Sequence, residues 1–121
     1  MAKQKIKKSQ IADQEPWTPV TFQNSWTNYG SGYDTAAYMK DSLGFVHIKG
    51  FVKSGTTSSS TPIFTLPVGY RPLNSSYNLV GRLGDGSTGC IEIRHDTGAV
   101  QVVVANATWT PLGNIVFRAE N

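Results

Sequence analysis

The chain has 121 residues, of which 39% are hydrophobic and 16% charged, with 12 glycines and 6 prolines. This length suits one domain, and low charge with many Gly, Ser and Thr residues excludes a helical bundle and is typical of short strands joined by turns. The single cysteine, Cys90, excludes an intrachain disulfide and a cysteine-based zinc site. There is no signal-peptide pattern and no long apolar run, so we expect a protein made in the cytoplasm and not inserted into a membrane.

The net charge of +3 lies mainly at the N-terminus. Four lysines in residues 1–15 oppose only Asp13 and Glu15, whereas the rest of the chain has seven basic and six acidic residues. A nucleic-acid-binding domain needs a basic face of its own, which this nearly neutral body does not offer. We therefore expect a basic arm or stalk remnant over 1–15, a folded domain over 16–121 and no nucleic-acid partner.

The domain is expected to begin with a strand and a long loop. Residues 17–22 predict a strand, and Pro19 confines it to a sheet edge because proline has no backbone N–H to donate. Residues 23–34 combine aromatic residues with Asn, Gly and Ser, a composition that favours a long ordered loop.

Residues 36–41 and 44–53 are expected to pair as a hairpin. Asp41 and Gly44 suit the first and last positions of a type I turn between them. Side chains alternate along a strand, so the second segment divides into two faces. One face carries Val46, Ile48 and Val52, and the other carries His47, Lys49, Phe51 and Lys53.

A proline-bounded corner follows the Ser/Thr-rich connection 54–61. Residues 62–66 predict a short strand that must stop at Leu66-Pro67-Val68-Gly69-Tyr70-Arg71-Pro72, because the two prolines remove backbone donors. Such a corner usually carries the chain from one sheet to another, and we expect the same here. Residues 77–83 predict the next strand.

The last third of the chain predicts a second hairpin and a closing strand. A tight glycine-rich loop over 83–89 leads into strands at 90–95 and 99–105, which turn at Asp96-Thr97-Gly98. Residues 115–119 close the fold. About eight short strands and no helix indicate an all-β fold: an antiparallel, jelly-roll-like β-sandwich.

Several motifs resemble catalytic or ligand sites, but each is better explained as a turn or as an ordinary strand position. Asp96-Thr97-Gly98 matches the aspartic-protease triplet, yet it joins two alternating strands and follows Arg94-His95. The loop 84–89 lacks the Lys-Ser/Thr ending of a P-loop. His47 and His95 have no second ligand at metal spacing, although three copies of one His could meet at a symmetry axis. We expect no enzyme activity, no catalytic residues, no cofactor and no metal.

The aromatic residues are the remaining functional signal. Trp26 and Trp109 are expected in the core or an interface, because large rings dominate burial. Tyr29 and Tyr33 lie in a Gly/Ser/Asn loop, where a ring can stack on a sugar beside polar groups such as Asp34. The predicted ligand-binding residues are therefore Tyr29, Tyr33 and Asp34.

Apolar side chains on the second face of two predicted strands indicate an assembly. Phe51 lies opposite Val46 and Ile48, and Cys90 lies opposite Ile91 and Ile93. We expect a symmetric partner chain to cover these faces, which a domain this small would need to bury more surface.

With these residues laid out, the chain resembles the C-terminal head domains of bacteriophage tail fibres and related receptor-binding proteins, in particular from phages and prophages of Gram-positive bacteria. The matching pieces follow the family's order over roughly residues 17–119, and the corner Leu66-Pro67-Val68-Gly69-Tyr70-Arg71-Pro72 is the most specific. The other pieces are Asn24-Ser25-Trp26-Thr27-Asn28-Tyr29, Ala37-Tyr38-Met39-Lys40-Asp41, Gly44-Phe45-Val46-His47-Ile48-Lys49-Gly50 and Leu112-Gly113-Asn114-Ile115-Val116-Phe117.

The resemblance implies a homotrimeric β-sandwich at the tip of a virion fibre, which attaches to a host cell-surface polysaccharide or another envelope component. The chain departs from the family in having Ser25 where Gly is frequent and almost no stalk before the domain. The alternative is therefore a structural virion module without a host ligand, such as a head fibre, a capsid decoration protein or a trimerisation domain, whose partners are other fibre or capsid proteins. A trimeric head on a bacterial collagen-like surface protein is a third possibility.

Overall fold

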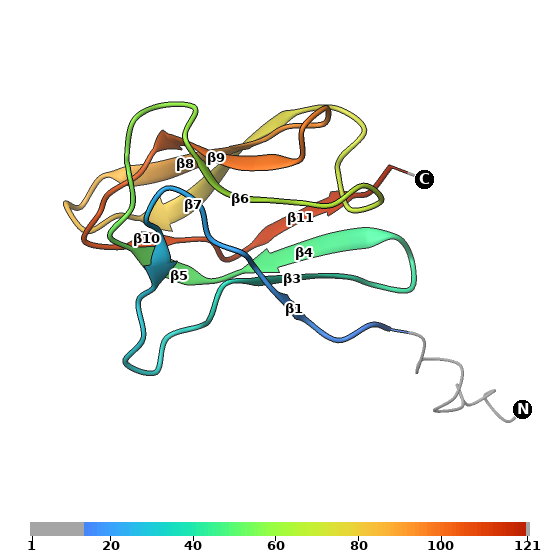
Figure 1. Ribbon diagram of the computed structural model, residues 1–121, viewed down its shortest axis with the longest axis horizontal. Coiled ribbons are helices and arrows are strands. Elements are labelled where there is room, and N and C mark those ends of the chain that lie inside the picture. The colour runs from blue at the N-terminus through green and yellow to red at the C-terminus, as the bar shows by residue number, and fades with distance from the viewer. Residues whose placement is uncertain (1–13, 121) are drawn as a thin grey trace, which may run out of the picture.

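The structure is a computed structural model that describes residues 14–120, and these residues form strands and turns with no helix (Figure 1). Eleven strands make three antiparallel sheets, in the orders β1-β3-β4-β11, β10-β5-β2 and β6-β9-β8-β7. The strands are β1 (Thr18–Pro19), β2 (Thr27–Asn28), β3 (Ala37–Lys40), β4 (Phe45–Lys49), β5 (Phe51–Lys53), β6 (Pro62–Thr65), β7 (Ser76–Arg82), β8 (Thr88–Ile93), β9 (Ala99–Val104), β10 (Thr110–Pro111) and β11 (Ile115–Arg118).

The two four-stranded sheets form separate layers, with the three-stranded sheet at one end (Figure 1). Their inner faces carry side chains from alternate positions, including Val46, Ile48, Ile91, Val100 and Val102, all at most 2% exposed. This arrangement confirms an all-β chain and is consistent with a β-sandwich. None of the residues described forms a helix that could cross a membrane.

Both predicted hairpins are confirmed. The turn between β3 and β4 closes with the Gly44 N–H donating to the Asp41 carbonyl at 3.0 Å, and the Asp41 carboxylate accepts the N–H groups of Leu43 and Phe45. In the second hairpin, Gly98 N–H donates to the Arg94 carbonyl at 3.1 Å between β8 and β9. Both turns use an Asp side chain to bind nearby backbone, as expected of turn residues.

The predicted strand 44–53 is wrong in one respect, because it divides at Gly50 into β4 and β5, which belong to different sheets. Gly50 has φ +148, and a Cβ there would lie 2.8 Å from the Cα of Ala36. A residue with a side chain would therefore be strained and would clash with backbone. The alternation survives the break, since Val46, Ile48 and Val52 are all buried.

The first strand and the following loop also differ from the prediction. The expected strand 17–22 shrinks to β1, a two-residue strand at a sheet edge as Pro19 requires. The expected loop 23–34 contains β2, which pairs with β5. Short bridges of this kind have no periodic pattern and leave no signal in the sequence.

The proline-bounded corner ends β6 as predicted but does not lead to another sheet. β6 and β7 lie on opposite edges of one sheet, and residues 66–72 pass around its end. There the corner bonds to the segment after β11: Glu120 N–H donates to the Arg71 carbonyl at 2.7 Å, and Pro72 bridges to Ala119. The predicted arm over 1–15 lies outside the described residues except for Gln14 and Glu15.

Candidate functional site

Four aromatic rings gather on the three-stranded sheet, at the end of the molecule where β5 and β10 are labelled in Figure 1. Tyr29 follows β2, Phe51 begins β5 and Trp109 precedes β10, while Tyr33 lies in the connection from β2 to β3. We call these four residues the aromatic cluster. Segments distant in the sequence thus meet through the pairing of three very short strands.

The backbone fixes two of the rings directly. Tyr29 N–H donates to the Phe51 carbonyl at 2.8 Å, and Phe51 N–H donates to the Asp34 carbonyl at 3.1 Å. The Asp34 backbone therefore holds the connection from β2 to β3 against β5. The first hydrogen bond extends the β2–β5 pairing by one residue, which places Tyr29 and Phe51 side by side.

A tight turn folds Tyr33 back over these rings. Tyr33 N–H donates to the Gly30 carbonyl at 3.0 Å, and the central residues Ser31 and Gly32 have φ +54 and +86. Positive φ at both central positions is the mark of a type I′ turn, for which glycine is well suited. The reversal brings the ring centroids of Tyr29 and Tyr33 to 5.2 Å.

The rings form an ordered array. Tyr33 stacks on Phe51 with centroids 4.6 Å apart and an interplanar angle of 18°, and Phe51 lies at 24° to Trp109 with centroids 6.2 Å apart. Tyr29 is close to perpendicular to all three, at 78–89°. Stacked and edge-to-face pairs are the favourable arrangements of aromatic rings, so the cluster stabilises its own geometry.

Two polar contacts complete the site. Trp109 Nε1 donates to the Arg82 carbonyl of β7 at 3.1 Å, which fixes the indole. The Lys53 Nζ lies over the Tyr29 ring, 5.4 Å from its centroid, within the range of a cation–π contact. Lys53 forms no ion pair with any residue in the range 14–120.

The predicted ligand-binding residues are only partly brought together. Tyr29 and Tyr33 are neighbours in the cluster, and Tyr33 is 55% exposed. Asp34 contributes its carbonyl to the cluster, and its exposed carboxylate makes no hydrogen bond to the described residues. The prediction missed Phe51 and Lys53, whose shared strand face with Lys49 was visible in the alternation, and treated Trp109 as core or interface.

Phe51 is half-buried by its own chain, and its expected cover by a partner chain stays a prediction. The rings of Tyr33 and Trp109 lie on either side of it in the stacked series and belong to the same chain. Trp26, by contrast, is a core residue as predicted, with 3% exposure, although its indole N–H has no hydrogen-bond partner among the described residues.

The protease-like and P-loop-like motifs are turns. Asp96 accepts hydrogen bonds from Arg94, and these hold the pKa of its carboxyl down at about 2, far from the shared-proton chemistry of an acid pair. In the loop after β7, Asp85 accepts from the hydroxyl and the N–H of Ser87, which lowers the pKa of the Asp85 carboxyl. Both carboxylates therefore stabilise local backbone turns.

Neither histidine belongs to a metal centre within the described part of the chain, where no three His, Cys, Asp or Glu side chains cluster. His47 Nε2 lies 2.9 Å from Asp41 Oδ2, and this hydrogen bond lowers the pKa of the Asp41 carboxyl. His95 Nδ1 lies 2.8 Å from the Ser75 hydroxyl. Each histidine ties two neighbouring segments together.

Comparison of the chain with protein-family models, with curated proteins and with solved structures gives no match.

Proposed function

We propose that this protein is a non-enzymatic receptor-binding head of a phage fibre, which binds a host cell-surface saccharide at the aromatic cluster. The observation that carries the proposal is the position of Tyr33. One face of its ring packs on Phe51, and the residue is still 55% exposed, from which we infer that the opposite face is open to solvent. A rigid ring with one open face can stack on the apolar face of a sugar.

The surroundings of Tyr33 suit a polar ligand with an apolar face. Small-molecule sites combine apolar surface with a few polar groups that fix orientation. Here those groups are the Tyr29 and Tyr33 hydroxyls and the Lys53 ammonium, with the Asp34 carboxylate following in the chain. The cluster is shallow, so we infer weak binding by each copy and a jelly-roll-like homotrimer that reaches useful affinity through several simultaneous contacts.

The test is binding of the protein to a panel of host cells and to purified cell-wall polysaccharide. Tyr33→Ala is expected to weaken binding by about tenfold or more, since one exposed aromatic anchor can carry much of the energy of a small interface. Tyr77→Ala is the matched control, because Tyr77 is also exposed (69%) but lies on β7. Mass should stay unchanged in both variants. Tyr33→Ala should lower the melting temperature, because it loses its ring pairs with Tyr29 and Phe51, but it should stay folded at the assay temperature.

A second candidate function, a structural virion module without a host ligand, is favoured by a different observation. Leu79, Cys90 and Val104 are cross-strand neighbours on β7, β8 and β9, and Leu79 is 75% exposed. An exposed apolar row on a sheet suits contact with another protein. Binding to capsids or tail parts, without binding to any cell in the panel, would replace the receptor-binding proposal with this one.

A further inference from the structure

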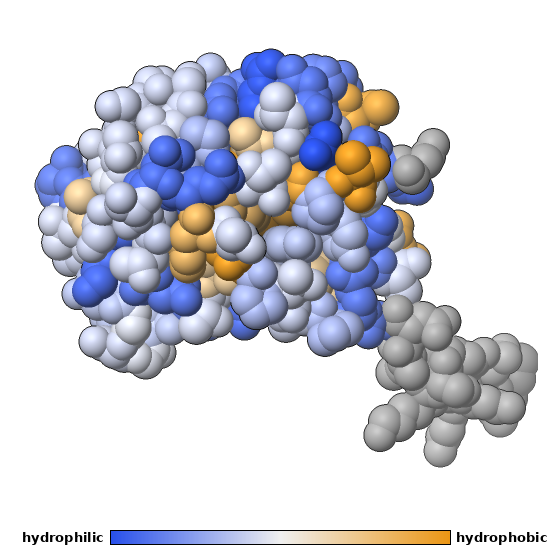
Figure 2. Space-filling model, viewed as in Figure 1, coloured by the Kyte–Doolittle hydropathy of each residue, from blue (hydrophilic) through white to orange (hydrophobic). Residues whose placement is uncertain are grey.

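The β3–β4 turn and the connection from β6 to β7 lie at the end of the molecule opposite β5 and β10 (Figure 1), and they carry three exposed aliphatic residues. Leu43, Val68 and Leu73 are 73–76% exposed. Leu43 lies in the β3–β4 turn, whereas Val68 and Leu73 both lie in the connection from β6 to β7, on the proline-bounded corner and just after it. Figure 2 shows apolar patches at this right-hand end, within a largely hydrophilic surface. We call these three residues and the hollows beside them the end face.

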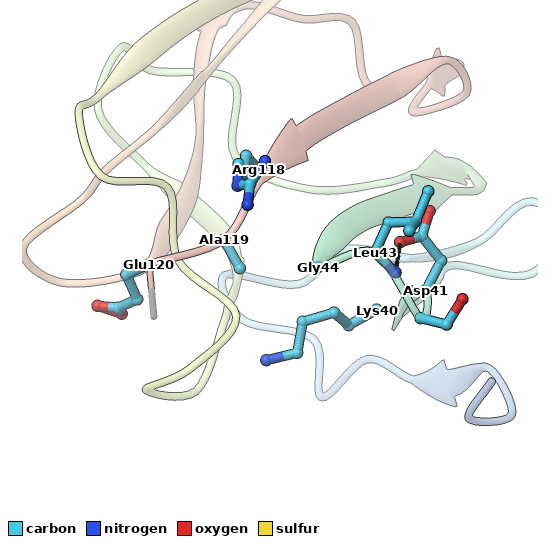
Figure 3. A pocket seen from close by; sticks show the side chains of 8 residues that line it. Lys40, Asp41, Leu43, Gly44, Arg118, Ala119 and Glu120 are labelled. Carbon is cyan, nitrogen blue, oxygen red and sulfur yellow. Dashed lines mark hydrogen bonds between the residues drawn. The ribbon is translucent and has the colours of Figure 1, made fainter. Parts of the chain in front are cut away.

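Two hollows lie beside Leu43 and Leu73. One, of about 300 Å³, is lined by Lys40, Leu43 and Arg118 among others (Figure 3). The other, of about 220 Å³, is lined by Leu73, Arg118, Ala119 and Glu120. Arg118 and Glu120 belong to both hollows, so the two are adjacent. The end face thus has both protrusions and recesses, which is the shape that a copy of the same surface can fit.

The end face carries two basic side chains, Lys40 and Arg118, and two acidic ones, Asp41 and Glu120, and only some of them are engaged in hydrogen bonds. Lys40 Nζ donates to the Gly69 carbonyl at 2.8 Å, and the Asp41 carboxylate is held by its own turn and by His47. Arg118, in contrast, forms no ion pair or hydrogen bond through its side chain with residues 14–120 and lies 5.8 Å from the Phe45 ring centroid.

Glu120 provides the opposite charge beside Arg118. Its carboxylate accepts one long hydrogen bond, from Gly69 N–H at 3.4 Å. The end face therefore offers one guanidinium and one carboxylate with unused hydrogen-bonding capacity. A second copy would present the same pair, so that Arg118 of one copy and Glu120 of the other could meet as a charge-assisted pair.

The end face is also well ordered. Ala119 N–H donates to the Gly44 carbonyl at 2.9 Å and Glu120 N–H donates to the Arg71 carbonyl at 2.7 Å, so the last strand is tied to both neighbouring connections. Tyr70 donates its hydroxyl to the Glu15 carboxylate at 2.7 Å. A surface held in this way loses little freedom on association, which favours binding.

We propose that the end face is the contact surface between copies of this chain, with aliphatic side chains of one copy entering the hollows of the next. If one part of the end face on one copy contacts a different part of the end face on the next copy, the contact is heterologous. Repeating it by rotation about an axis then closes the copies into a ring. This inference does not rest on the proposed saccharide site, which lies at the opposite end.

The first test is the mass of the full chain in sedimentation at high micromolar concentration. The unmodified protein should be an oligomer, and Val68→Ser with Leu73→Ser should weaken association by about tenfold or more. The control pair, Tyr77→Ser with Leu79→Ser, is equally exposed on β7 and should leave the mass unchanged. Melting curves verify that every variant is folded.

The second test exchanges the charges. Arg118→Glu should weaken association, and adding Glu120→Arg should restore it, because the two charges are then merely exchanged between copies. A monomeric unmodified protein would overturn the proposal. So would dissociation by the β7 pair but not by the Val68 and Leu73 pair, or a failure of the second charge change to restore the mass.

Discussion

The aromatic cluster and the end face both expose apolar side chains, but they support them differently. In the cluster, each ring packs on at least two others, and Trp109 is fixed by a hydrogen bond to Arg82. On the end face, Leu43, Val68 and Leu73 project from turns and keep about three quarters of their surface in water. The rings of the first surface support one another, whereas the second has recesses and, within residues 14–120, an Arg118 side chain that forms no ion pair or hydrogen bond.

This difference separates two ways in which a small β domain can use exposed apolar groups. Rings that stack on one another provide a rigid platform for a small flat ligand at little cost in ordering. Aliphatic side chains beside hollows provide protrusions for a protein surface of complementary shape. The comparison can be tested by changing one region at a time.

The largest expected effect is on folding stability at the cluster. Phe51→Ala removes the ring that stacks between Tyr33 and Trp109, and we expect a loss of about 2–3 kcal/mol in the free energy of unfolding, from lost burial and ring pairing. Val68→Ala, on the end face, should change it by less than about 0.5 kcal/mol. Urea unfolding measures both. Equal losses would show that the two regions are supported alike.

A smaller effect is expected next to the end face, where the Glu15 carboxylate accepts a hydrogen bond from the Tyr70 hydroxyl and raises the pKa of Tyr70 to about 12. The protonated phenol is favoured in the folded state, so its contribution is complete below the ordinary pKa near 10 and is lost as pH rises to about 12. Tyr70→Phe should cost about 1 kcal/mol near neutral pH and remove this part of the alkaline decline. Thermal unfolding of the two proteins between pH 8 and pH 12 would reveal the difference, and parallel curves would refute it.

The smallest effect is expected away from both regions, at the β8–β9 turn. Arg94 holds the pKa of the Asp96 carboxyl at about 2, so the stabilising contribution is present above the ordinary value near 3.8 and is lost as pH falls toward 2. Because both side chains are on the surface, Asp96→Asn should shift the melting temperature only slightly, and only above about pH 4. Melting curves at pH 2 and pH 6 provide the comparison. A shift of the same size at both pH values would contradict it.

Much of the fold could be predicted from local sequence patterns. Alternating apolar residues predicted β4, β8 and β9, and Asp41 with Gly44 and Asp96 with Gly98 predicted the two hairpin turns. These signals are local, because each depends on residues that are close in the chain. β2 and β10 have two residues each and no period, so only their pairing with β5 defines them.

The candidate site was harder to predict, because the aromatic cluster depends on contacts between distant segments. The loop composition around Tyr29 and Tyr33 was visible, but nothing in the chain places Trp109 beside them until β10 pairs with β5. The contacts of Phe51 with Tyr33 and Trp109 were not predicted, since alternation shows the face of a strand but not what lies on it. The end face was not predicted for the same reason: Leu43, Leu73 and Glu120 line neighbouring hollows only in the folded chain.

Gly50 has a mechanical consequence for the aromatic cluster. It is the only residue between β4, which pairs with β3 and β11, and β5, which carries Phe51. A tensile load that enters through the chain ends would reach the rings along extended backbone, with no compliant loop in between. Inserting one residue beside Gly50 would let the two sheets move independently, so that the rings would shift under a tensile load.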